Sequence, residues 1–334
     1  MANPVLVEVL RGNIVESRHR GSFCVMDADG HVVLSGGDIE AAVFPRSAVK
    51  AIQALPLLES GAADAFGFGN REIALACASH SGEPGHADLA KAMLAKAGLD
   101  ETALECGEHW PMHQEAALDL ARRGGSPTAL HNNCSGKHSG FVCTCHHLGI
   151  DHRGYVGASH ESQRMVRDAM ETVTGAAHGE DVCGIDGCSI PTYAVPLKSL
   201  ALGFARMATG VGFGQGRAVA AKRILAACMA EPFEVAGTDR MDTRLMRATG
   251  GRIFVKTGAE GVYCAAIPER GLGIAIKCDD GTTRASETSV AALLARLLGE
   301  QDALSPTLIE LANPVMKNWN GIEVGRTRPV AGVF

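Results

Sequence analysis

Hydrophobic and polar residues alternate along the start of the chain, which is the pattern of half-buried β-strands. Arg11-Gly12-Asn13 separates the first two alternating segments, and Asp27-Ala28-Asp29-Gly30 forms a turn between the last two. Short connections of this kind predict an antiparallel meander. Its predicted strands are residues 5–10, residue 15 onward, 22–27 and 31–34.

From residue 46 to about residue 228, the hydrophobic positions instead repeat with the period of amphipathic helices. Glycine-rich loops separate these segments. The predicted helices are residues 47–58, 86–97, 114–122, 161–173 and 216–229.

Alternation returns near the end of the chain and predicts three more strands, followed by a closing helix. The strands are residues 252–256, 261–267 and 272–278, and the helix is 286–298. Residues 327–334 are expected to form a docked or loosely ordered tail.

Strands at both ends around a helical middle predict an α/β (α+β) fold, with one antiparallel sheet built from the N- and C-terminal strands. Residues 1–45 and 230–334 would form the sheet-containing subdomain, and 46–229 a mainly helical one. We expect residues 1–334 to be a single catalytic unit, with the active site where the two subdomains meet.

Composition narrows the function classes. The net charge is −6 and the pI is about 6.1, which gives no basic stripe for nucleic acid. No apolar run is long enough to span a bilayer, so a membrane role is also disfavoured. Polar and charged residues occupy the N-terminus where a signal peptide would be apolar, so we expect a cytoplasmic protein. Eleven cysteines then indicate reduced thiols or metal ligands rather than disulfides.

Two short motifs suggest serine chemistry. Ser47-Ala48-Val49-Lys50 is an S-x-x-K box, and Lys256-Thr257-Gly258 is a K-T-G box; both occur in penicillin-binding and serine β-lactamase type enzymes. On a helix, Ser47 and Lys50 share a face, so the lysine amine could take the serine proton. An S-x-x-K box alone also fits an ordinary helix start with a solvated lysine.

A second serine lies between the two boxes, in Cys77-Ala78-Ser79-His80-Ser81-Gly82-Glu83. Ser79 could relay protons, or it could cap the helix that starts near residue 86. His80 beside a serine could indicate a Ser-His pair, but adjacent side chains rarely point at each other.

Two glycine-rich turns each surround a cysteine. They are Asn132-Asn133-Cys134-Ser135-Gly136-Lys137-His138-Ser139-Gly140 and Gly184-Ile185-Asp186-Gly187-Cys188-Ser189-Ile190-Pro191. Two thiols from separate loops can meet on one metal ion, and sulfur ligands favour zinc. Two cysteines alone do not complete a tetrahedral site.

These motifs, together with K-T-G-A-E-G, occur in the same order in rhizobial-type L-asparaginases, and the chain resembles that family over nearly its whole length. The resemblance implies a fold like those of glutaminases and serine β-lactamases. It also implies two serine-lysine pairs, Ser47 with Lys50 and Ser79 with Lys256. The zinc ligands that it implies are Cys134, Lys137 and Cys188, with water or substrate in the fourth position. The family further implies a homodimer.

The expected reaction is hydrolysis of the side-chain amide of L-asparagine to L-aspartate and ammonia. Ser47 would attack the amide carbon after losing its proton to neutral Lys50, and Ser79 with Lys256 would relay a proton to the departing ammonia. The backbone N–H of Ser47 and one near Gly258 or Ala259 would hold the oxyanion. Which of the two serines is the nucleophile stays open at this stage.

The substrate's charged groups need fixed partners. The predicted substrate-binding residues lie beside the motifs: Arg46, His80, Glu83, Asp186 and Gly258. Zinc held by two thiolates and an amine is a weak acid, so it would position substrate or fix the loops.

Two alternatives stay open. S-x-x-K and K-T-G boxes also serve glutamine and β-lactam hydrolysis, so a glutaminase or a lactam-ring hydrolase is possible. A cytoplasmic zinc- or thiol-sensing protein would use Cys134 and Cys188 and leave the serine boxes without a role.

Overall fold

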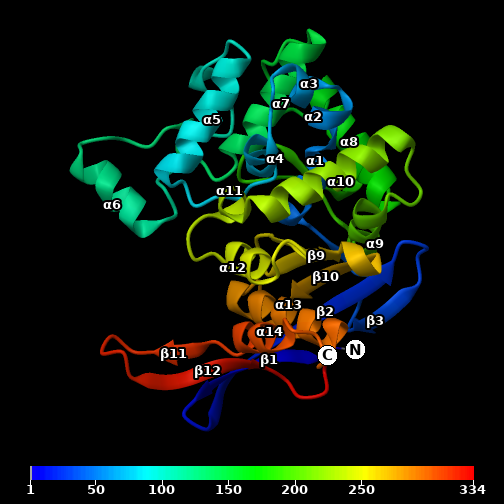
Figure 1. The fold of residues 1–334 in the computed structure, drawn as a ribbon, viewed down its shortest axis with the longest axis vertical. Coiled ribbons are helices and arrows are strands. Elements are labelled where there is room, and N and C mark those ends of the chain that lie inside the picture. Colours follow the sequence, from blue (N-terminus) through cyan, green and yellow to red (C-terminus); the bar gives the residue numbers. More distant parts are fainter. Residues whose placement is uncertain (1) are drawn as a thin grey trace.

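The main sheet is antiparallel and takes its strands from both ends of the chain. A computed structural model describes residues 2–334, and within them eight strands form this sheet: β1 (Val5–Arg11), β2 (Ile14–Asp27), β3 (Val32–Gly36), β8 (Phe254–Thr257), β9 (Val262–Ile267), β10 (Leu272–Cys278), β11 (Val315–Lys317) and β12 (Glu323–Pro329). The order is β11-β12-β1-β2-β10-β9-β8, and β3 pairs with β2. Figure 1 shows the first and last strands of the chain side by side. The predicted α/β class, with an antiparallel sheet from both termini, is confirmed.

Strand β2 joins the two halves of the sheet. Its first half pairs with β1, and residues 21–27 pair with β10. The changeover lies at Gly21, where a Cβ atom would come within 2.3 Å of the Lys277 carbonyl oxygen. The two predicted segments, from residue 15 onward and 22–27, are therefore parts of one strand.

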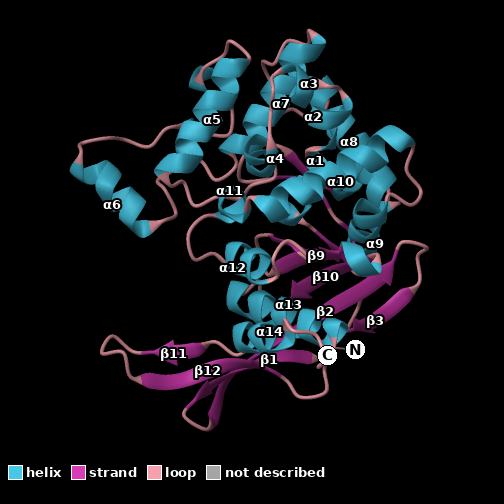
Figure 2. Ribbon diagram, viewed as in Figure 1, coloured by secondary structure: helices cyan, strands magenta, loops and turns pink. Residues whose placement is uncertain are grey.

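Helices occupy most of the middle of the chain and also cover the sheet (Figure 2). They are η1 (Arg46–Val49), α1 (Lys50–Gln53), α2 (Leu55–Glu59), α3 (Ala62–Ala65), α4 (Asn70–Ala76), α5 (Pro84–Lys96), η2 (Glu101–Ala103), α6 (Gln114–Arg122), η3 (Ala129–His131), α7 (Ser135–Leu148), α8 (Glu161–Thr174), η4 (Glu180–Val182), α9 (Leu197–Thr209), α10 (Gln215–Ala230), α11 (Pro232–Ala236), α12 (Met241–Ala248), η5 (Pro268–Arg270), α13 (Thr283–Leu298) and α14 (Ser305–Ala312). Two small sheets pair β4 (Ala42–Val43) with β7 (Val195–Pro196) and β5 (Cys183–Ile185) with β6 (Pro191–Tyr193).

Helices cover both faces of the main sheet. On one face α9 lies very close to β10, because a Cβ atom at Gly273 would be 2.0 Å from the Ala201 carbonyl oxygen. On the other face α13 and α14 pack against the strands (Figure 1). Burial of the apolar side chains on these faces provides the main favourable contribution to folding. Most of the other helices form a second body above the sheet (Figure 1). The K-T-G box, at the end of β8, lies between this helical body and the sheet.

The predicted helix 47–58 consists of three short helical pieces. The segment is helical as expected, but it is divided into η1, α1 and α2 rather than forming one continuous helix. Pro56 lies in the first turn of α2 and has no N–H to donate to the preceding turn, so the helix cannot continue through it. The break leaves Ser47 and Lys50 on a short helical segment of their own.

The prediction that a helix closes the chain was wrong. Helix α13 is not the last element, because α14, β11 and β12 follow it. Residues 327–329 belong to β12, which pairs with β1. The rest of the expected tail is docked, since the Val330 N–H donates to the Leu6 carbonyl at 2.9 Å and the Phe334 ring packs against Phe23.

All eleven cysteines have free thiols, and ten of them are buried. Across residues 2–334, the structure contains no helix that combines the length and the apolar character needed to cross a membrane.

Candidate active site

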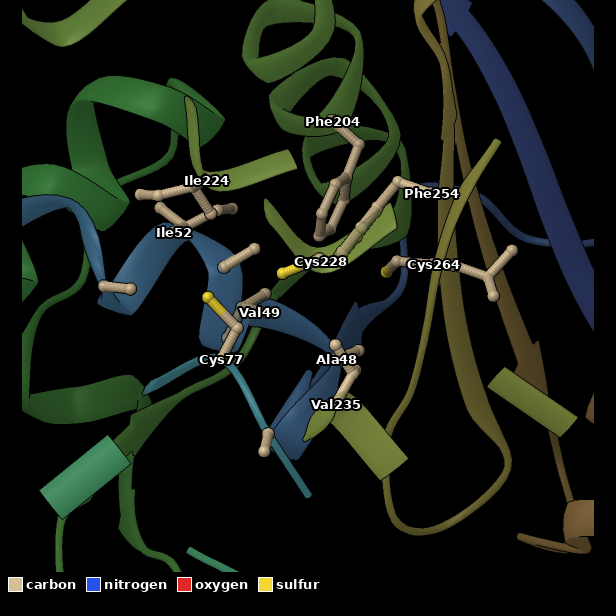
Figure 3. Close-up of a cluster of buried hydrophobic side chains, with 14 of the residues drawn as sticks. Ala48, Val49, Ile52, Cys77, Phe204, Ile224, Cys228, Val235, Phe254 and Cys264 are labelled. Atoms are coloured by element: carbon tan, nitrogen blue, oxygen red, sulfur yellow. The ribbon is translucent and has the colours of Figure 1, made fainter. Parts of the chain in front are cut away.

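Ser47 and Lys50 lie on a helical segment that is anchored by buried apolar side chains. Ser47 is in η1 and Lys50 begins α1. Ala48 and Val49 between them are buried, and Figure 3 shows both in a cluster that also contains Cys77. Ser47 is partly exposed, whereas Lys50 is fully buried. Ser47 is therefore accessible to a substrate, whereas Lys50 lies in the interior of the protein.

Gly258 allows the K-T-G strand to approach this segment closely. A Cβ atom at position 258 would be 2.7 Å from the Pro45 carbonyl oxygen and 3.3 Å from the Ala48 side chain. Any side chain would push β8 away from η1. The glycine of the K-T-G box thus brings the end of β8 next to Ser47.

Ser79 is held between two neighbouring segments. Its N–H donates to the Val235 carbonyl at 2.9 Å, and the Asn133 side-chain amide donates to its hydroxyl, also at 2.9 Å. The Ser79 hydroxyl in turn donates to the Ser47 hydroxyl in a long contact of 3.4 Å. The two serines predicted to act together do lie together.

The hydrogen bonds of Lys50 connect the serine segments to the cysteine loop. Its amine donates to the Ala78 carbonyl at 2.6 Å and to the Cys134 sulfur at 3.1 Å. It therefore contacts the backbone next to Ser79 and one of the predicted metal ligands, Cys134.

Lys256 lies on β8, two residues before the glycine that packs against the Ser47 segment, and it is also fully buried. Its amine donates to the Thr257 carbonyl at 3.0 Å and to the Asp242 carboxylate at 3.5 Å. Burial lowers the pKa of Lys256 to about 8, and the positive charge of Lys50 acts in the same direction, while Asp242 opposes the shift. A substantial fraction of Lys256 is therefore neutral near physiological pH.

Sequence reasoning did not identify two residues that contact this group. Asn133 belongs to a motif that was singled out, but its contact with Ser79 depends on the fold. Asp242 lies in α12, outside every motif, and no local pattern distinguishes it from a solvated helix residue. Only the structure brings its carboxylate to Lys256.

The predicted metal ligands form a compact buried cluster. Cys134 precedes α7, Lys137 lies in the first turn of α7, and Cys188 follows β5. The Lys137 amine donates to the Cys188 sulfur at 3.1 Å, and the Cys134 and Cys188 thiols are close enough to shift each other's pKa. Within residues 2–334 no group of three or more His, Cys, Asp or Glu side chains is suited to a metal ion, so a metal here needs the lysine as its third ligand.

Charges are distributed unevenly in this cluster. The hydrogen bond from Cys188, with help from Lys50 and Lys137, holds the pKa of Cys134 well below its ordinary value despite burial. The same hydrogen bond and burial raise the pKa of Cys188. Burial opposes the charged form of Lys137, but the neighbouring sulfurs outweigh it and its pKa is raised. Without metal, the cluster therefore favours a Cys134 thiolate together with a Lys137 ammonium group.

Arg46 and Asp186 form an ion pair beside Ser47. The guanidinium Nη2 lies 2.7 Å from the Asp186 carboxylate, and Nε donates to the same oxygen at 2.8 Å. Burial opposes ionisation of Asp186, but Lys137 and Arg46 outweigh it and lower its pKa. Arg46 has a left-handed backbone with φ of 52°, which is strained for a residue other than glycine.

The other two predicted substrate-binding residues have different surroundings. His80 is fully buried; its Nδ1 accepts from the Gly82 N–H, and its Nε2 lies 2.9 Å from the Ser135 hydroxyl. Burial lowers the pKa of His80 well below its ordinary value, so the ring is neutral. Glu83 accepts hydrogen bonds from the Thr238 N–H and hydroxyl at 2.8 and 2.7 Å. Both residues thus connect loops around Ser79.

Two contacting serine hydroxyls, flanked by two buried lysines, form a site suited to amide hydrolysis through a serine nucleophile. The chain belongs to the L-asparaginase II family, which it matches over residues 7–329. Membership of this family makes it an amidohydrolase and suggests hydrolysis of asparagine, which confirms the resemblance drawn from the motifs.

Two solved structures are similar to the chain. One is Mglu, with a TM-score of 0.38 and 16% identity over 90% of this chain and 72% of that one. The other is the octameric penicillin-binding protein homologue from Pyrococcus abyssi, with a TM-score of 0.36 and 11% identity over 94% of this chain and 84% of that one. Similarities this distant carry no argument about function. No curated protein matches the chain by sequence.

Proposed function

We propose that this chain hydrolyses L-asparagine to L-aspartate and ammonia, with Ser47 as the nucleophile. The observation that carries this proposal is the contact of 3.4 Å between the Ser47 and Ser79 hydroxyls, together with the buried Lys50, whose amine donates to the carbonyl of Ala78 beside Ser79 in the chain. Of the two serines Ser47 is the more exposed, and its hydroxyl accepts the hydrogen bond from Ser79. Its exposure is what favours Ser47 as the group that meets the substrate.

In the first step Ser47 attacks the amide carbon and its proton passes to a neutral lysine amine. Lys50 lies one helical turn along the same segment and is the proposed acceptor. The new C–O bond forms as the carbonyl oxygen becomes an oxyanion. Gly258 donates its N–H to the Val262 carbonyl at 2.8 Å, so of the two predicted positions on this strand Ala259 is the proposed donor to the oxyanion, together with Ser47.

In the second step the C–N bond breaks and the leaving nitrogen takes a proton, so that ammonia departs. Ser79 is the proposed relay, because its hydroxyl contacts Ser47 and is itself fixed by Asn133. The proton would come from Lys50, which took it from Ser47 in the first step. Neutral Lys256, with a pKa of about 8, would then accept a proton through Ser79 from the water that attacks the aspartyl ester, and would return it to the Ser47 oxygen as the ester bond breaks.

Arg46 and Asp186 are proposed to bind the charged end of asparagine. A guanidinium recognises the α-carboxylate and a carboxylate recognises the α-ammonium. Their mutual ion pair in the free protein keeps both charges fixed and only partly exposed beside Ser47. Glutamine is longer by one CH₂ group, so it could not place its amide at Ser47 and its charges at this pair equally well.

Cys134, Lys137 and Cys188 are proposed to bind zinc. Two sulfurs in contact and an amine 3.1 Å from one of them are a suitable donor set for a tetrahedral ion that keeps one open position. Bound zinc would supply a fixed positive charge and a Lewis acid. The protein's own contribution is to connect the start of α7 to the loop that carries Asp186.

A homodimer and a cytoplasmic location remain predictions.

Ammonia release from L-asparagine and L-glutamine tests the proposed function. Wild type should release ammonia from asparagine in preference to glutamine, and Ser47→Ala should release none from either. Ser159→Ala, which changes an exposed serine, is the matched control and should behave as wild type. Mass spectrometry of acid-quenched enzyme should find the aspartyl ester on Ser47. An ester on Ser79 would reverse the proposed roles of the serines, and a wild type without ammonia release would exclude the function.

A further inference from the structure

Asp242 is a buried carboxylate with three partners in the sheet. It lies in the first turn of α12 and is 1% exposed. Its oxygens accept the Thr257 N–H at 3.1 Å and the Lys256 amine at 3.5 Å, and they accept a hydrogen bond from the Tyr263 hydroxyl. A buried carboxylate is costly unless it is paired in this way. The arrangement therefore connects α12 directly to the K-T-G strand.

The position of Thr257 explains why a carboxylate is needed here. Strand β8 is the last strand of the main sheet and pairs only with β9 among residues 2–334. Gly258 directs its N–H to β9, so the N–H of Thr257 points to the open edge. A buried N–H group without a partner would cost free energy, and Asp242 satisfies this one. The carboxylate therefore acts as a substitute for a neighbouring strand.

Lys256 is surrounded by few charges, and Asp242 is the one of opposite sign. The charged and titratable groups around it are Asp242 on α12, Arg240 just before α12, Lys50 on α1, Cys228 on α10 and Cys264 on β9. Beyond Asp242 lies Glu287 on α13, whose pKa burial raises to about 7, with Asp242 adding to the shift. Asp242 is therefore the group that opposes neutralisation of Lys256.

We propose that Asp242 is a positioning residue that holds the amine of Lys256 and the K-T-G strand in place for proton transfer at Ser79. The inference rests on the proposed function and adds a residue that no motif contains. Asp242 touches neither the serines nor the site beside Ser47; it acts through Lys256 and through the backbone of Thr257.

The direction of its effect on pH dependence follows from charge. Lys256 must be neutral to accept a proton, so activity rises with pH through the pKa of Lys256, which is about 8. Asp242 raises that pKa, because a nearby negative charge favours the ammonium form. Removal of the charge should therefore lower the pKa and move the acidic limb of the pH profile to lower pH.

Asp242→Asn tests this with little change of shape. The amide oxygen can still accept from Thr257 and Tyr263, but the charge is lost. The acidic limb of kcat for asparagine should move down by about one pH unit or more. Glu287→Gln removes the buried carboxyl beyond Asp242 whose pKa is about 7, so a limb that remains in this variant does not belong to Glu287.

Thr243→Val is the matched control. Its hydroxyl donates to the Gly237 and Pro232 carbonyls at 2.6 and 3.1 Å, so its loss loosens α12 but leaves the carboxylate in place. This variant should melt earlier and keep the wild-type limb. An unmoved limb in Asp242→Asn, or an equal shift in Thr243→Val, would overturn the proposal.

Unfolding experiments test the same coupling without activity. The pKa of Lys256 is about 8 in the folded protein against 10.5 for an ordinary lysine. Between these two pKa values the unfolded chain binds more protons at this residue than the folded protein does. The contribution of Lys256 to the free energy of unfolding therefore increases as pH rises. In Asp242→Asn the gain should begin at lower pH, and an unchanged onset would contradict the coupling. Should wild type release no ammonia, the proposed function fails, while this measurement still decides whether Asp242 sets the charge of Lys256.

Discussion

The charge state of Lys256 distinguishes two roles for this residue. A fully buried amine with a pKa of about 8 can act as a base near neutral pH, or it can serve as a fixed positive charge for the oxyanion. Arginine keeps the charge but does not deprotonate. If the neutral amine is needed, Lys256→Arg should lower kcat for asparagine about 10²-fold or more at pH 8. Steady-state ammonia release checks this.

This substitution needs a control for correct folding, because arginine is larger than lysine and the site is buried. A melting temperature within a few degrees of wild type would show that the buried site accommodates it. Near-wild-type kcat in such a folded variant would mean that Lys256 supplies only charge.

The ion pair of Arg46 and Asp186 makes a prediction about substrate affinity. Both guanidinium contacts use one carboxylate oxygen, and a lysine amine cannot reproduce this geometry. Arg46→Lys should raise KM for asparagine about tenfold or more while kcat changes less. Arg217→Lys is the matched control, because Arg217 pairs with Glu59 through the same two nitrogens on another part of the surface. Equal effects of the two substitutions on KM would exclude a role for Arg46 in binding.

Of the two predicted serine-lysine pairs, only Ser47 with Lys50 is marked by local sequence. Ser47 and Lys50 are three residues apart, so helix geometry alone places them together. Asp242 and Tyr263 are contacts of tertiary structure, and each would be an ordinary helix or strand residue without the neighbouring element. The contact of Ser79 with Asn133 likewise depends on two loops meeting, which no spacing within either loop reveals.

At the scale of elements, the approach of β8 to η1 depends on Gly258. A Cβ atom there would lie 2.7 Å from the Pro45 carbonyl oxygen, so Gly258→Ala must separate the strand from the helical segment. We expect a loss of about 1–3 kcal/mol in the free energy of unfolding, from forced overpacking. Activity should fall as well, because the N–H groups of the strand move away from Ser47. Denaturant unfolding and ammonia release measure the two effects.

Gly216→Ala is the control for this prediction. Gly216 lies near the start of α10, and a Cβ atom there meets nothing within 4 Å. Alanine favours helices over glycine by up to about 1 kcal/mol, so this variant should be as stable as wild type or more so. A Gly258→Ala protein with unchanged stability and activity would show that the two elements can separate without harm.

The elements that sequence predicted best have a strong hydrophobic period or alternation. The predicted bounds of α6 and β10 match the structure, and those of α8 and α10 differ by only one residue at an end. Strand β12 was missed for a physical reason: its buried positions are Gly325 and Thr327, which give no hydrophobic signal. It is a strand because β1 pairs with it, and that partner is more than three hundred residues away in the sequence.

At the scale of the whole molecule, the cysteine cluster joins segments of the helical body that are distant in sequence. Cys134 and Lys137 lie at the start of α7, and Cys188 lies on the turn after β5. Lys50 also contacts Cys134, so the cluster is connected to the helical segment that carries Ser47. A metal bound here would link two parts of the chain, the start of α7 and the turn after β5. Its removal should therefore affect the stability of the fold as well as the reaction.

Zinc should stabilise the protein in a way that depends on this cluster. A ligand that binds only the folded state at a hundred times its Kd adds about 2.7 kcal/mol to the free energy of unfolding. The melting temperature of chelator-treated wild type should thus rise by several degrees on addition of zinc, and that of Cys188→Ala should not.

Cys183→Ala is the matched control, because Cys183 lies on β5 close to Cys188 in the chain and its sulfur donates to the Gly184 carbonyl rather than to the cluster. It should respond as wild type does. A zinc response of equal size in Cys188→Ala would locate the metal elsewhere, and no response in wild type would remove zinc from the proposed function while leaving the serine-lysine chemistry intact.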